Sequence, residues 1–128
     1  MNTLLLCPPT AYDIVYKINP WMDVTKKVDQ QKVLKEYQEL KNVYKELGCK
    51  ILEIEQKEDL PDMVYVANYG FVKNKTFIKA NFTFEQRKGE AELAKHYFQR
   101  QGYIIEELPE TINWEGQGDL LEIGRAHV

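Results

Sequence analysis

The chain has 128 residues, with 17 basic and 20 acidic side chains and a formal net charge of −3 at pH 7. Hydrophobic residues make up 44% of the sequence and charged residues 29%, which is typical of soluble globular proteins and excludes a disordered or collagen-like chain. The slightly acidic balance argues against a nucleic-acid partner, and the length allows one domain or part of one.

The N-terminal segment carries a short apolar run, residues 4–7, which ends at Pro8 and Pro9. A membrane span needs about 20 apolar residues, and the run is flanked by neither a charged segment nor a cleavage site. We therefore expect no membrane partner, no signal peptide and a cytoplasmic location. The same run predicts a buried strand over residues 3–7, closed by the two prolines.

The two cysteines, Cys7 and Cys49, each lie among aliphatic residues. Neither has a nearby histidine or the Cys-x-x-Cys spacing of a metal site, and two cysteines do not make a disulfide framework. We expect both side chains to be buried and inert, with no bound metal.

The next segments are predicted to be a loop and a helix. Residues 8–27 contain Asn19 directly before a proline, which disfavours helix there. Residues 29–47 show helical periodicity, with Asp29 as a candidate N-cap and Gly48 as the C-terminal stop. The apolar face of this helix comprises Val33, Tyr37, Leu40, Tyr44 and Leu47.

The remaining elements follow from the same signals. They are a strand at 49–55, a strand pair at 63–67 and 70–82, a helix at 85–101, a strand at 103–108 and a loop at 110–119. The turn of the strand pair is placed at Asn74, because asparagine tolerates a positive φ. Gly102 ends the second helix, whose apolar side includes Leu93, Ala94, Tyr97 and Phe98.

These elements repeat at a lag of 54 residues. Gly48 then corresponds to Gly102, and Glu53 corresponds to Glu107. A period near 50 residues is typical of a propeller or a similar array, in which about three or more units are usually needed for stability. Only about two units fit into this chain, so we expect it to be marginally stable alone, oligomeric or prone to aggregation.

Several polar side chains lie where folding does not require polarity: Asp62, Asn68, Arg87, Glu115 and Asp119. Each has a structural alternative, as a turn residue, a solvated helix charge or a loop carboxylate. Taken together, two carboxylates, an amide and an arginine suggest a ligand with a cationic end and a carboxylate end. A planar cation pairs well with a carboxylate, and a carboxylate pairs well with an arginine fork.

A series of motifs in order along the chain carries a resemblance. They are Leu-Cys-Pro-Pro at 6–9, Asn-Pro-Trp-Met at 19–22, Pro-Asp-Met-Val-Tyr-Val-Ala-Asn at 61–68, Asn-Phe at 81–82, Arg-Lys-Gly-Glu at 87–90 and Trp-Glu-Gly-Gln-Gly-Asp at 114–119. Over about residues 3–121 the chain resembles the guanidino-group-modifying (pentein) superfamily. It looks closest to the branch that holds arginine dihydrolase and dimethylarginine dimethylaminohydrolase. The resemblance implies an α/β fold, a partial β/α propeller with about two of five ββαβ units.

The resemblance also implies a reaction and roles for single residues. A cysteine thiolate attacks the guanidinium carbon, a histidine acts as general acid and base, and no metal or organic cofactor takes part. Glu115 matches the acidic catalytic residue that holds the guanidinium and orients the histidine. Arg87 matches the arginine that grips the substrate α-carboxylate, and Asn19 and Asp62 match substrate-binding positions. Asn68 also matches a substrate-binding position, where it would contact the polar end or the guanidino nitrogens of the substrate. It favours the dihydrolase branch, since methylarginine enzymes have aspartate there.

The family's nucleophilic cysteine and catalytic histidine lie in the second half of the enzyme, and neither has a counterpart here. We expect His96 to be a solvent-facing helix residue. We interpret residues 1–121 as the N-terminal part of one domain. Residues 122–128, which include His127, are interpreted as a spurious tail of a truncated reading frame.

The resemblance leaves the function open among three alternatives. The first is a hydrolase acting on arginine or a related guanidino or ureido compound, inactive as this piece alone. The second is an amidinotransferase, in which an amine rather than water resolves the intermediate. The third is a non-catalytic binding protein on the same fold. If the chain belongs to an enzyme, its partner is a small-molecule substrate. Association into a homo-oligomer is a further alternative.

Overall fold

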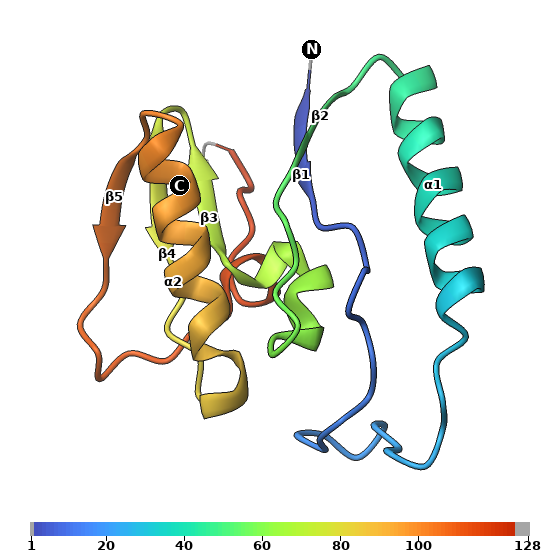
Figure 1. Cartoon of the computed structure of the whole chain (residues 1–128). Coiled ribbons are helices and arrows are strands. Elements are labelled where there is room, and N and C mark those ends of the chain that lie inside the picture. The colour runs from blue at the N-terminus through green and yellow to red at the C-terminus, as the bar shows by residue number, and fades with distance from the viewer. Residues whose placement is uncertain (1, 125–128) are drawn as a thin grey trace. The chain divides into compact units, whose positions relative to one another are not determined.

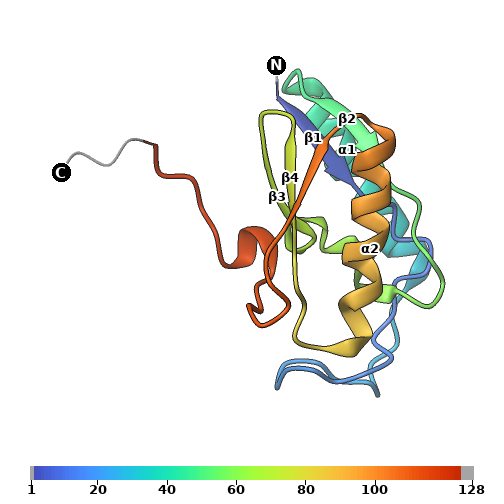
Figure 2. The ribbon, with the colours of Figure 1, turned by 90° about the vertical axis from the view of Figure 1, so that its left-hand side faces the viewer.

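The structure, a computed structural model, describes residues 2–124 (Figures 1 and 2). Its helices and strands are β1 (Thr3–Leu6), α1 (Gln30–Glu46), β2 (Lys50–Glu53), β3 (Gly70–Lys73), β4 (Thr76–Lys79), α2 (Glu85–Arg100) and β5 (Ile104–Glu107). Short 3₁₀ helices span Pro61–Val64, Val66–Asn68 and Gly116–Gly118. The chain divides into two compact units, residues 1–66 and 67–128, and each is described by itself. Within the described residues, neither helix is long and apolar enough to cross a membrane.

In residues 1–66, β1 and β2 form a two-stranded parallel sheet, with Leu5 opposite Leu52, and α1 contacts β2. The predicted cap is confirmed, because the Asp29 side chain accepts a hydrogen bond of 3.0 Å from the backbone N–H of Lys32. An apolar groove of about 350 Å³ runs along α1 beside Tyr37.

In residues 67–128, the order of strands is β3-β4-β5, with β3 antiparallel and β5 parallel to β4. The hairpin turn at Asn74 is confirmed by its φ of 56°. A parallel pair requires a crossover connection, which α2 provides, and both views show α2 beside this sheet (Figures 1 and 2). The core centres on Phe77 and Phe98, whose rings stack with centroids 4.2 Å apart.

The predicted repeat is visible in the backbone where each helix ends. Gly48 and Gly102 share a φ of +79°, which favours glycine. The Gly48 N–H donates to the carbonyl of Lys45 at 2.9 Å, and the Gly102 N–H donates to that of Gln99 at 3.0 Å. The residue after each glycine also donates to a carbonyl five residues back, at 3.0 Å in both cases. Both ends are therefore Schellman motifs.

An ion pair between helix and strand repeats at the same lag. Lys41 on α1 lies 2.6 Å from Glu53 on β2, and Lys95 on α2 lies 3.1 Å from Glu107 on β5. The repeat therefore extends from the helix ends to side chains that fasten each helix to its strand.

The strand expected at residues 63–67 is wrong, because this segment forms 3₁₀ turns. The Met63 N–H donates to Leu60 and the Tyr65 N–H donates to Asp62, at 3.1 and 3.0 Å. The apolar run suggested a strand by composition, but Pro61 favours the first position of a helical turn, and the turn buries Met63 completely.

Two expectations about burial also need correction. The apolar face of α1 is not buried, since Leu40 and Leu47 are 47% and 72% exposed. Cys7 is buried as predicted, whereas Cys49 is only half-buried because it precedes β2 at a sheet edge. His96 is exposed, as expected, and its ring contacts the carbonyl of Glu92.

Candidate functional site

A buried ion pair stands at the start of α2. The Arg87 guanidinium donates from Nε to Glu90 Oε2 at 2.9 Å and from Nη2 to Glu90 Oε1 at 2.8 Å. Arg87 is only 6% exposed and Glu90 is fully buried. The geometry is the fork-on-fork pairing that arginine forms with a carboxylate, made across one helical turn.

The same guanidinium holds Asn68. Arg87 Nη1 donates to Asn68 Oδ1 at 3.2 Å, and Asn68 Nδ2 donates in turn to the backbone carbonyl of Glu115 at 3.3 Å. The guanidinium also lies 4.6 Å from the centroid of the Phe82 ring, a cation–π distance. Three predicted site residues, from three separate segments, therefore form one hydrogen-bonded chain.

The loop that carries Glu115 is held close to the start of β3. The backbone N–H of Glu115 donates to the Asp119 carboxylate at 2.7 Å. Gly116 has a φ of +59°, and a Cβ there would lie 2.6 Å from the carbonyl oxygens of Ala67 and Gly70. Only glycine allows this close approach, so Gly116 is the residue that brings Glu115 to Asn68.

Two predicted site residues lie in residues 1–66. Asp62 is 5% exposed and accepts a hydrogen bond of 2.6 Å from the Tyr16 hydroxyl. Asn19 is exposed, and its side-chain oxygen accepts from the N–H groups of Trp21 and Met22 at 3.0 and 3.1 Å. Asn19 therefore stabilises an Asx-type turn in the predicted loop, whereas Asp62 is a buried acceptor.

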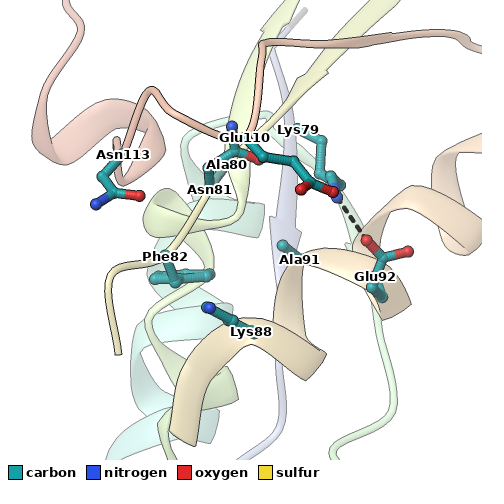
Figure 3. A pocket seen from close by; sticks show the side chains of 9 residues that line it. All are labelled: Lys79, Ala80, Asn81, Phe82, Lys88, Ala91, Glu92, Glu110 and Asn113. Atoms are coloured by element: carbon teal, nitrogen blue, oxygen red, sulfur yellow. Dashed lines mark hydrogen bonds and ion pairs between the residues drawn. The ribbon is translucent and has the colours of Figure 1, made fainter. Parts of the chain in front are cut away.

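A cavity of about 350 Å³ lies in residues 67–128, and its lining includes Phe82, whose ring also faces Arg87 (Figure 3). It is lined by Lys79, Ala80, Asn81, Phe82, Lys88, Ala91, Glu92, Glu110 and Asn113. Burial acts to lower the pKa of Lys79, but its hydrogen bonds to Glu92 and Glu107 outweigh this and raise that pKa. None of the five predicted site residues lines this cavity.

Sequence reasoning overlooked Glu90 and treated Arg87 partly as a solvated helix charge. A usable signal was present, because Arg and Glu three residues apart share a helix face with the small residues Ala91 and Ala94. A charged pair on the apolar side of a helix indicates a buried polar function rather than a surface ion pair.

Comparison with known proteins assigns the chain to a family. Residues 9–128 match the family described as N,N dimethylarginine dimethylhydrolase, eukaryotic, and the chain belongs to it. It is 40% identical over 121 residues to the N(G),N(G)-dimethylarginine dimethylaminohydrolase of Mycobacterium tuberculosis, covering 93% of this chain and 39% of that protein. It is 35% identical over 120 residues to the bifunctional arginine dihydrolase/ornithine cyclodeaminase ArgZ of Synechocystis sp., covering 92% of this chain and 17% of that protein. The chain thus spans less than half the length of these relatives.

Solved structures confirm the fold class. The crystal structure of unliganded AgrE matches with a TM-score of 0.85 and 32% identity. The match covers 91% of this chain and 17% of the AgrE chain. A mutant N-terminal domain of ArgZ bound to its substrate matches with a TM-score of 0.83 and 31% identity. The match covers 91% of this chain and 43% of that domain's chain. The predicted α/β fold, part of a pentein-type propeller, and the resemblance to guanidino-modifying proteins are confirmed. The roles of single site residues stay predictions, and His127 lies outside the described residues.

Proposed function

We propose that this chain is the N-terminal part of a hydrolase that acts on arginine or a closely related guanidino compound. The observation that carries the proposal is the hydrogen-bonded chain from Arg87 through Asn68 to Glu115. Family membership supports the chemical class, and relatives named as arginine dihydrolases and dimethylarginine dimethylaminohydrolases share most of this chain's length.

In this proposal Glu115 is the acidic group for the substrate guanidinium. A guanidinium is a planar cation, and a carboxylate accepts two of its N–H groups in parallel. Asn68 Nδ2 donates to the Glu115 backbone carbonyl, and in this proposal its amide assists that carboxylate in binding the substrate. Asn68 rather than aspartate favours arginine over dimethylarginine as the substrate.

The role proposed for Arg87 is narrower than the resemblance alone implies. Glu90 takes the Nε and Nη2 groups that would form a bidentate pair with a substrate carboxylate. We therefore propose that any contact with a substrate α-carboxylate is made by an Nη N–H group of Arg87 that does not point toward Glu90. The substrate-binding roles of Asn19 and Asp62 remain proposals for mutation.

The covalent steps need a thiolate and a histidine that the motifs in this chain do not supply. We propose that the piece binds substrate without turning it over. Water, rather than an amine, resolves the intermediate in the complete enzyme, which distinguishes the hydrolase from an amidinotransferase. A cytoplasmic location and self-association of the isolated piece belong to the same proposal.

The test is a titration of the ¹⁵N-labelled 128-residue chain with L-arginine, asymmetric dimethyl-L-arginine and L-lysine. We expect shifts of the Asn68 side-chain and Glu115 backbone signals with L-arginine, weaker ones with the dimethylated compound and none with L-lysine. An assay for citrulline, ornithine and ammonia should show no product. Equal responses to L-arginine and L-lysine would contradict the proposed specificity for guanidino compounds. Product formation would contradict the proposed inactivity of this chain alone.

A further inference from the structure

We propose that Glu90 is a positioning residue for the candidate site, acting through Arg87 on Asn68. This inference rests on the proposed function for its substrate, but its geometry stands on the chain itself. Glu90 is fully buried and accepts two parallel hydrogen bonds, at 2.9 and 2.8 Å, from one guanidinium.

The orientation of Asn68 follows from this pairing. Two parallel bonds fix the plane and the rotation of the Arg87 guanidinium, which lies over the Phe82 ring. Nη1 is then placed to donate to Asn68 Oδ1, so the amide must present Nδ2 toward the Glu115 carbonyl. Through Arg87, Glu90 thereby determines the direction in which the Asn68 amide points its accepting oxygen and its donating NH₂ group.

Stability alone does not explain the buried pair. Two charges lose their hydration on burial, and an apolar pair of similar size is often equally stable or more stable. The repeat supplies an internal comparison, because Val33 and Glu36 occupy the corresponding positions on α1. The side chain of Glu36 is 62% exposed and lies 3.9 Å from Lys32 at the surface.

The same helix position is therefore a surface charge in one unit and a buried charge in the other. The buried version occurs where Asn68 and Glu115 meet. The corresponding α1 positions hold Val33 and a surface Glu36, so the repeated helix–strand unit forms without this buried pair, and we infer that the pair serves the neighbouring site.

The experiment compares Glu90→Gln with Glu36→Gln as the matched control in the full chain. Glutamine keeps the shape of the side chain and loses the charge and one acceptor. We expect Glu90→Gln to stay folded by backbone signals, to shift the Asn68 side-chain NH₂ signals and to raise the Kd for L-arginine at least tenfold. Glu36→Gln should leave both readouts unchanged.

A folded Glu90→Gln chain with wild-type Asn68 signals and a Kd within twofold of the control would overturn the proposal. If this variant fails to fold, the wild-type chain decides. Separate Nη–H signals of Arg87 with cross-peaks to the Asn68 amide support positioning, whereas one averaged signal from a freely rotating guanidinium overturns it. If the wild-type chain binds no guanidino compound, the proposed function fails, and the Asn68 signals still decide the role of Glu90.

Discussion

Each of the two units contains a helix that ends at a glycine and continues into a strand. In residues 1–66, α1 leads through Gly48 into β2, and in residues 67–128, α2 leads through Gly102 into β5. The hydrogen bonds at the two helix ends match. The burial of the two helices is nevertheless very different. No residue of α1 is buried, whereas α2 buries six, two of them the charged pair described above. The comparison shows that one local pattern can specify the same turns and ion pairs while the packing around them differs.

The largest expected contrast comes from the matched positions Phe98 and Tyr44. Phe98 is buried and stacks on Phe77 at 4.2 Å, so Phe98→Ala should lower the free energy of unfolding by about 3–5 kcal/mol. Tyr44 is half-buried, and Tyr44→Ala should cost about 1 kcal/mol or less. Urea unfolding followed by tryptophan fluorescence and circular dichroism measures both, since Trp114 is buried and Trp21 is already exposed. Equal costs would show that the burial difference has no energetic meaning.

The second contrast concerns the glycine that shapes the site. Gly116→Ala combines a positive φ with a Cβ only 2.6 Å from two backbone oxygens, so we expect a loss of about 2–4 kcal/mol in unfolding free energy. The substitution should also separate the Glu115 loop from Asn68 and abolish the L-arginine response. A stable variant that still binds L-arginine would show that the close approach is not needed.

The two helix-ending glycines should behave alike. A Cβ at Gly48 or Gly102 meets nothing within 4 Å, so each Gly→Ala cost comes from the positive φ alone, about 1 kcal/mol. Urea unfolding of both single variants measures the two costs. A difference above 1 kcal/mol would mean that the repeated helix ends are not energetically equivalent.

The sequence predicted the elements best where local chemistry decides them. The caps at Asp29, Gly48 and Gly102 and the turn at Asn74 depend on single residues with strong preferences. The failure at residues 63–67 has the opposite cause. An apolar run indicates burial but not which element provides it, and here a 3₁₀ turn that starts at Pro61 buries Met63 completely.

For the site, the sequence indicated which residues matter but not how they connect. Family motifs named Asn68, Arg87 and Glu115, and the structure joins them within one hydrogen-bonded chain. The Arg–Glu spacing is the same for a surface pair and a buried one, and the signal that separates the two, the small residues Ala91 and Ala94 on the same helix face, was overlooked. Whether Glu90 is buried depends on the packing of α2, which the α1 counterpart does not share.

The smallest expected effect comes from the repeated helix–strand ion pairs. The pKa of Glu53 is lowered mainly by a hydrogen bond from Lys41 and less by one from Tyr37. The pKa of Glu107 is lowered mainly by a hydrogen bond from Lys79 and less by one from Lys95. A carboxyl group with a lowered folded-state pKa stabilises the fold above its unfolded pKa of about 4.3, and this contribution is lost as the pH falls through the folded-state value.

The side chains of Glu53 and Glu107 are 37% and 42% exposed, so solvent screens both carboxylates and each contribution should stay below about 1 kcal/mol. Urea unfolding at pH 7 and at pH 3 should therefore show a smaller pH-dependent loss of stability in Glu107→Gln and in Glu53→Gln than in the wild-type chain. Because Glu107 faces two lysines and Glu53 mainly one, the Glu107→Gln variant should differ more. If neither substitution changes the pH dependence, the repeated pairs are geometric copies without a measurable share in stability, and the similarity of the two units is confined to their backbones.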